Sequence, residues 1–143
     1  MQFDPENKIV KLCAAAMDLE GDGTNRAAEM FMQAWNEASD ATEKFIAAHY
    51  IARQQPTVTE KLQWDQTALE FALQSNDEKL KGAFPSLYLN IGKCYEDLGD
   101  PKKALENYQS GESYFEYLQP DGYGEFTRST VERAIARVSV GRS

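Results

Sequence analysis

The sequence has few histidine and cysteine side chains, which often act in catalysis and metal binding. It contains one histidine, His49, and two cysteines, Cys13 and Cys94. A metal site built from several histidines is therefore excluded, and a Ser-His-acid triad would depend on a single residue. The two cysteines are far apart and lack metal-ligand spacing, so we expect reduced thiols on apolar helix faces.

Long apolar runs and strand-like patterns are also missing. No run approaches the roughly 18 residues that a membrane span needs. The first residues, MQFDPENK, are polar and acidic, unlike a secretory signal. Alternation of apolar and polar residues does not occur at useful length. We therefore expect a cytoplasmic, all-α protein, and 143 residues suit a single domain.

The loops that bind phosphate groups are absent as well. The sequence has no G-x-x-x-x-G-K-[ST] loop, and Gly21 and Gly23 lack both a third glycine and a preceding strand. Glu96 and Asp97 are neighbours on a predicted helix, where their carboxylates point apart. We therefore expect a protein that is not an enzyme and holds no cofactor.

Positive charge is scarce, with a net charge of −8 at pH 7. Nucleic-acid binding needs clustered Lys and Arg, so we expect no nucleic-acid partner, and no membrane partner either. Basic residues gather only in the last segment, where Glu132 stands against Arg128, Arg133, Arg137 and Arg142. We expect these arginines to form the solvated, outward face of a terminal helix.

Apolar residues recur at helical spacing along the whole chain. They predict three antiparallel helix pairs over about residues 5–38, 41–75 and 77–118, and a seventh helix over about 123–140. In the third pair, Pro85 is expected to kink or restart the first helix. Gly99, Asp100 and Pro101 supply a stop, an N-cap and a first turn. The second helix of this pair is expected to continue to Leu118.

Residues 85–118 resemble a tetratricopeptide repeat. That pattern places an aromatic, a large aliphatic, a glycine and a tyrosine on one helix, then an alanine and an aromatic on its partner. The matching residues are Tyr88, Ile91, Gly92, Tyr95, Ala104 and Tyr108. A glycine inside a helix costs about 1 kcal/mol relative to alanine. The resemblance explains Gly92, because a small residue lets the helices approach closely opposite Ala104.

The two earlier pairs match the same pattern more loosely. The resemblance implies one domain over residues 1–143, in which the pairs stack as a right-handed superhelix and the last helix caps the array. The whole chain is also similar to short bacterial proteins that are sometimes labelled rRNA adenine methyltransferases. Such an enzyme needs a glycine-rich loop after a strand and a loop for the flipped base. Neither is present, so this activity is not expected.

Tetratricopeptide arrays hold a peptide or a partner helix on a concave face lined by the first helix of each pair. The resemblance therefore implies a protein-interaction adaptor or scaffold. The candidate groove residues are Met17, His49, Arg53, Asn90, Lys93 and Asp97. Of these, Arg53, Asn90 and Lys93 have side chains that can bind a carboxylate. A solvated polar face is the alternative.

Two further possibilities stay open. The segment 18–29 places carboxylates at the first, third, fifth and twelfth positions of an EF-hand loop, with Gly23 at the sixth. These weak metal candidates are Asp18, Glu20, Asp22 and Glu29. Because no second loop is present to pair with it, we expect an acidic turn, with a weak calcium site as the alternative. A short array can also self-associate through its exposed end, giving a homo-oligomer.

Overall fold

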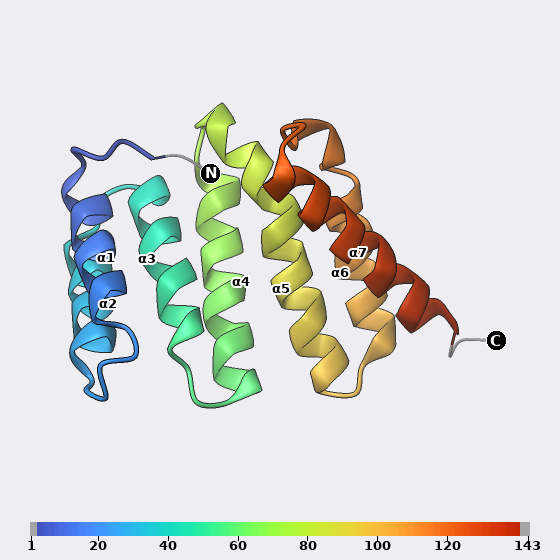
Figure 1. Cartoon of the computed structure of the whole chain (residues 1–143), viewed down its shortest axis with the longest axis horizontal. Helices are drawn as coiled ribbons and strands as arrows, with labels where there is room; N and C mark the ends of the chain where they lie inside the picture. The colour runs from blue at the N-terminus through green and yellow to red at the C-terminus, as the bar shows by residue number, and fades with distance from the viewer. Residues whose placement is uncertain (1–2, 141–143) are drawn as a thin grey trace. The chain divides into compact units, whose positions relative to one another are not determined.

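A computed structural model describes residues 3–140 of the chain. The described residues form helices joined by turns and contain no strand (Figure 1). The predicted all-α class is therefore confirmed. The helices gather into two compact units, an N-terminal unit of residues 3–76 and a C-terminal unit of residues 77–140. No helix among these residues has the length and apolar character needed to cross a membrane.

The N-terminal unit contains four α-helices. They are α1 (Lys8–Leu19), α2 (Arg26–Glu37), α3 (Ala41–Arg53) and α4 (Val58–Gln74). Side-chain oxygens of Asn7, Asp40 and Thr57 accept backbone N–H groups in the first turns of α1, α3 and α4. These N-caps satisfy donors that have no partner inside a helix. Helix α3 lies centrally, because it packs against all three of the others.

The core of the N-terminal unit is rich in alanine. Small side chains let the helices approach closely around the few large ones, and two of these, Phe31 and Phe45, are fully buried. The ring of Tyr50 stacks on Phe31 with centroids 5.3 Å apart. Cys13 is a buried thiol, as expected, and burial raises its pKa to about 11.

The C-terminal unit contains three α-helices and two short 3₁₀-helices. In chain order they are η1 (Glu78–Ala83), α5 (Phe84–Asp97), α6 (Pro101–Glu112), η2 (Phe115–Tyr117) and α7 (Gly122–Val140). The restart predicted at Pro85 is confirmed, because η1 ends there and Pro85 lies in the first turn of α5. Gly99 has a φ of 81°, and Asp100 caps α6, as their residue types predict.

The prediction that the second helix continues to Leu118 is wrong. Helix α6 ends at Glu112, and the chain then tightens into η2. The reason is aromatic packing, since the ring of Tyr114 stacks on Phe84 of α5 with centroids 4.7 Å apart. If α6 continued as a regular α-helix, Tyr114 would lie along α6. Its contact with Phe84 of α5 competes with that position.

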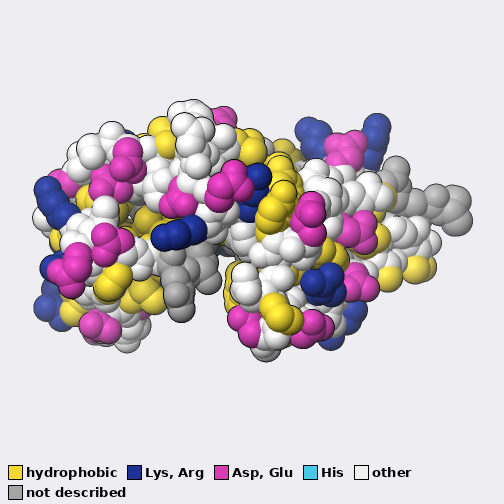
Figure 2. Space-filling view, turned by 90° about the horizontal axis from the view of Figure 1, so that it is seen from above, with side chains coloured by type: hydrophobic (Ala, Val, Ile, Leu, Met, Phe, Trp, Pro, Cys, Tyr) yellow, Lys and Arg dark blue, Asp and Glu magenta, His cyan; other side chains and the backbone are white. Residues whose placement is uncertain are grey.

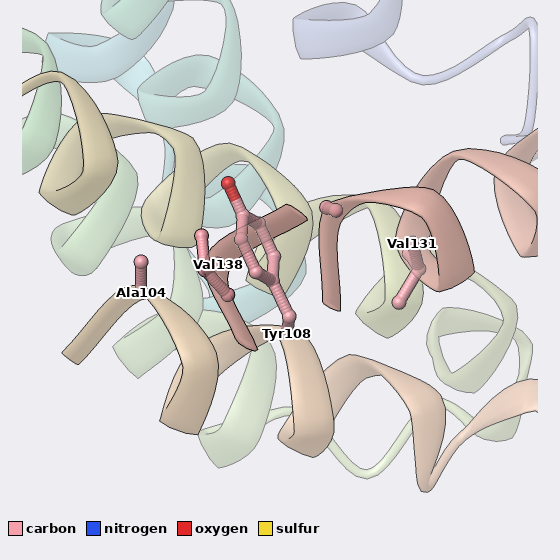
Figure 3. Close-up of a cluster of buried hydrophobic side chains, with 5 residues drawn as sticks. Ala104, Tyr108, Val131 and Val138 are labelled. Atoms are coloured by element: carbon pink, nitrogen blue, oxygen red, sulfur yellow. The ribbon is translucent and has the colours of Figure 1, made fainter. Parts of the chain in front are cut away.

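The contact between α5 and α6 is built on Gly92. A Cβ added at this glycine would lie 2.5 Å from Cε1 of Tyr108 and 3.1 Å from the carbonyl oxygen of Ala104. The close approach predicted for Gly92 is therefore confirmed. Tyr108 and Ala104 also belong to a buried cluster that α7 completes with Val131, Ala134 and Val138 (Figure 3).

Candidate functional site

Two predicted groove residues share one side of α3. Phe45, His49 and Arg53 recur at every fourth position, so they form a single row, called here the α3 stripe. Exposure increases along this row: Phe45 is buried, His49 is half-buried and Arg53 is exposed. The stripe therefore offers an apolar end, a polar middle and a cationic end within one helix.

The cationic end of the α3 stripe already holds a carboxylate. Nη2 of Arg53 donates to Oε1 of Glu20 at 2.7 Å, and Nε2 of Gln54 donates to Oε2 at 2.6 Å. The guanidinium also lies 5.2 Å from the ring centroid of Tyr50. Arg53 therefore has the geometry to bind a carboxylate, and in this structure that carboxylate belongs to Glu20.

His49 carries the most unusual polar atom in the N-terminal unit. Its Nδ1 is buried, and within residues 3–140 it has no hydrogen-bond partner. The ring lies between Phe45 and Tyr50, with centroid distances of 6.2 and 5.2 Å. Burial, reinforced by the positive charges of Arg53 and Lys61, lowers the pKa of His49 to about 4. The imidazole is therefore neutral near pH 7.

The other predicted groove residues divide between the two units. Met17 is exposed on α1 of the N-terminal unit, with 42% of its surface accessible. Asn90, Lys93 and Asp97 all lie on α5 of the C-terminal unit. Nζ of Lys93 lies 2.9 Å from Oδ1 of Asp97, so these two form an ion pair within the helix. Of these residues, Met17, Lys93 and Asp97 are exposed and Asn90 is half-buried.

The loop between α1 and α2 turns its carboxylates in different directions. Glu20 is directed to Arg53, as described above. Asp22 instead accepts hydrogen bonds from Thr24 and from Nη2 of Arg26, the latter at 2.8 Å. These bonds, with Thr24 the largest cause, lower the pKa of Asp22 to about 2. The loop is therefore tied by internal polar contacts of the kind that fix turns.

The remaining two weak metal candidates do not complete a binding site. Asp18 and Glu29 are exposed on α1 and α2. Across residues 3–140, no three His, Cys, Asp or Glu side chains are grouped so that they could hold one metal ion.

The C-terminal unit contains a polar network that sequence patterns did not reveal. The hydroxyl of Tyr108 donates to Oε1 of Glu96 at 2.7 Å. Arg137 of α7 grips the same carboxylate with two bonds, from Nε to Oε2 at 2.7 Å and from Nη2 to Oε1 at 2.8 Å. Arg137, and then Tyr108, hold the pKa of Glu96 down at about 2. This network fastens α5, α6 and α7 together.

The expectation that the arginines of α7 face outward holds only in part: Arg133 and Arg137 are exposed, but Arg137 is also paired, and Arg128 is half-buried. Arg137 binds Glu96, and Nη2 of Arg128 donates to the carbonyl oxygen of Phe115 at 3.4 Å. The guanidinium of Arg128 also lies 5.1 Å from the Phe115 ring centroid. The physical reason is that α7 packs on α5 and α6, which brings Arg137 to a carboxylate of α5 and Arg128 to a carbonyl oxygen of η2. Arg142 lies outside the described residues.

A double-mutant cycle measures what the Glu96–Arg137 pair contributes. We expect Glu96→Gln and Arg137→Met each to lower the free energy of unfolding of the C-terminal unit, with a coupling of about 1 kcal/mol, because Arg137 is half exposed. Urea denaturation followed by far-UV circular dichroism gives these values. Arg133→Met, at an exposed position of the same helix, should change stability by less than about 0.5 kcal/mol. Additive effects at positions 96 and 137 would show that the pair contributes nothing.

The face in Figure 2 carries no field of a single sign. Figure 2 shows Lys and Arg side chains interspersed with Asp and Glu over the face in view, together with scattered apolar side chains. A clustered cationic surface is what phosphate backbones require. The face in view instead mixes both signs of charge.

Comparisons of the chain with protein-family models, with curated proteins and with solved structures found no match.

Proposed function

We propose that this protein is a non-catalytic interaction module of the tetratricopeptide type, which binds a peptide or a partner helix through the first helices of its pairs. The observation that carries the proposal is the close contact of α5 with α6. There Gly92, Ala104 and Tyr108 pack against one another in the roles that the repeat pattern assigns to them. Arrays of this type act by binding, through a few side chains on the first helices.

The chemistry of those first helices supports a peptide ligand. Arg53 and Lys93 each hold a carboxylate at less than 3 Å, and both pairs are partly exposed. Exposed pairs of this kind contribute little stability, so a ligand's carboxylate can replace the internal one at small cost. His49 adds a neutral ring with an unpaired nitrogen, and Met17 adds an exposed, adaptable apolar side chain.

Self-association is the second candidate, and one feature of α7 favours it. Tyr123 and Phe126 expose 49% and 65% of their surfaces in its first turns. Two neighbouring exposed aromatic side chains are a common element of protein interfaces. Gel filtration across a range of concentrations separates a dimer formed in this way from a monomeric adaptor.

A pull-down with matched charge variants tests the proposed function. The test variant carries Arg53→Glu and Lys93→Glu on the first helices α3 and α5. The control carries Arg26→Glu and Lys102→Glu, which reverse one Arg and one Lys on the second helices α2 and α6. We expect a partner that the original protein and the control both retain and the test variant loses. A synthetic peptide from that partner should bind the test variant about tenfold more weakly or worse, which is about 1.4 kcal/mol.

Two results would contradict the proposal. Equal capture of the same proteins by all three forms would show that the first helices are not the binding face. Capture of nothing beyond further copies of the chain itself would favour self-association instead.

A further inference from the structure

Residues 3–7, named here the strap, lie across the start of α3 in the N-terminal unit. The ring of Phe3 packs edge-to-face on Phe45, with centroids 6.2 Å apart and an interplanar angle of 62°. Asn7 caps α1 and also donates from Nδ2 to Oε2 of Glu43 at 2.8 Å. The strap is thus held on α3 by one aromatic contact and one hydrogen bond. Between these anchors its side chains are exposed.

The strap covers the apolar end of the α3 stripe. Phe45 is completely buried, although Arg53 at the other end of the same row is exposed. Phe3 is itself only half-buried, and its ring packs on Phe45 from the segment that precedes the first helix. Edge-to-face packing depends on the shape and charge distribution of two aromatic rings. The covered position is therefore suited to an aromatic side chain.

We propose that the strap is an internal ligand of the α3 stripe, and that the partner is a peptide whose aromatic side chain replaces Phe3 on Phe45. This inference rests on the proposed function, because it identifies the class of peptide that the first helices bind. Phe3 occupies the site when no partner is present, and it leaves when the partner arrives.

The rest of the α3 stripe defines the remainder of the peptide. Nδ1 of His49 is buried and has no partner among the described residues, so the ring must turn outward before the backbone of a longer peptide can supply that hydrogen bond. Beyond His49, Arg53 can exchange Glu20 for a carboxylate of the peptide. Eight residues of helix span about 12 Å, the length of roughly four residues of extended chain. The partner therefore carries an aromatic and an acidic side chain about four residues apart.

Tethering makes the internal ligand an effective competitor. A group attached through a short linker acts at an effective concentration in the millimolar range. An external peptide of moderate affinity consequently binds the intact protein poorly. It binds well once the aromatic ring of Phe3 has been removed.

Fluorescence anisotropy with two labelled peptides tests the inference. The probes are Phe-Asp-Pro-Glu-Asn-Lys, which copies residues 3–8, and Phe-Ser-Ala-Ser-Glu, which places an aromatic and a carboxylate four residues apart. Each is paired with a peptide that has alanine in place of phenylalanine. We expect Phe3→Ala to bind both phenylalanine peptides at least tenfold more tightly than the original protein. The alanine peptides should bind neither form.

Two further variants serve as controls for this experiment. Phe3→Leu keeps an apolar side chain at the position and should bind the peptides with intermediate affinity, even if Phe3→Ala folds poorly by circular dichroism. Phe126→Ala removes an exposed aromatic residue from the C-terminal unit and should bind as the original protein does.

Equal affinity of the original protein and Phe3→Ala, or no binding of either up to about 1 mM peptide, would overturn the inference. The proposed function can survive that outcome. One further result separates the two proposals. If the Arg53→Glu and Lys93→Glu variant lost a partner that bound Phe3→Ala no better than the original protein, the interaction module would be supported and the internal ligand would be contradicted.

Discussion

Replacing Gly92 by alanine is expected to destabilise the C-terminal unit by about 2 kcal/mol, although alanine is the better helix former by about 1 kcal/mol. The added Cβ would lie 2.5 Å from Cε1 of Tyr108, well inside normal contact distance. The ring cannot turn aside easily, because it is fully buried and its hydroxyl is bonded to Glu96. The carbonyl oxygen of Ala104, only 3.1 Å away, blocks the other direction. Overpacking therefore outweighs the gain in helix propensity.

Urea denaturation followed by far-UV circular dichroism measures this loss. Gly122→Ala is the matched control, since a Cβ added at Gly122 meets no atom within 4 Å, and its stability should be unchanged or slightly higher. Both tryptophans, Trp35 and Trp64, belong to the N-terminal unit, so their fluorescence reports that unit separately. If Gly92→Ala were as stable as the original protein, the close contact would not be what holds α5 to α6.

The helices and the Gly92 contact were predictable because their signals are local. Helical periodicity marks each element, and punctuating residues such as Gly99, Asp100 and Pro101 set the boundary between α5 and α6. Gly92 is informative for a related reason. A glycine in the middle of a strong helical pattern has a cost, and close packing is the commonest compensation.

The end of α6 was not predictable, because packing rather than local preference decides it. Nothing in the residues after Glu112 forbids a helix, and only the aromatic partners on α5 draw Tyr114 out of it. The hydrogen-bond network of Glu96 is also decided by packing rather than by local sequence. Arg137 lies 41 positions from Glu96 in the chain, so no window of sequence contains both.

The candidate site depends partly on local sequence signals and partly on contacts between distant residues. The spacing of His49 and Arg53 placed them on one face of a helix, and the structure adds that Arg53 binds Glu20, 33 positions away. The contact of Phe3 with Phe45 was also out of reach of periodicity, since Phe3 precedes the first helix. One signal was available, however. An aromatic residue in the otherwise polar segment MQFDPENK needs a place to pack.

Acidification from pH 7 to pH 4 is expected to cost the N-terminal unit about 3 kcal/mol through His49 alone. In the folded chain the pKa of His49 is about 4, whereas in the unfolded chain it is about 6.5. Between these values the unfolded chain binds a proton that the folded chain cannot, so the unfolded state gains free energy as the pH falls. The loss begins near pH 6.5, is complete near pH 4, and is absent above pH 7.

The lowered pKa of His49 has three causes, which are burial and the charges of two neighbours. Burial removes the imidazolium from water, and Arg53 on the same helix and Lys61 on α4 repel its charge. Urea titrations followed by the fluorescence of Trp35 and Trp64 give the stability of the N-terminal unit at each pH. Carboxylates also titrate in this range, so the informative quantity is the difference between the original protein and a variant without the histidine.

His49→Gln and His49→Leu are suitable variants, because neither side chain titrates between pH 4 and pH 7. Each variant has its own stability at pH 7, but its decline towards pH 4 should be smaller than that of the original protein by about 3 kcal/mol. Parallel curves for all three proteins would mean that the folded chain accepts the proton on His49, and so that the ring is well solvated. The unpaired Nδ1 would then have water as its partner, and the α3 stripe would lose the hydrogen-bonding group that a bound peptide is proposed to satisfy.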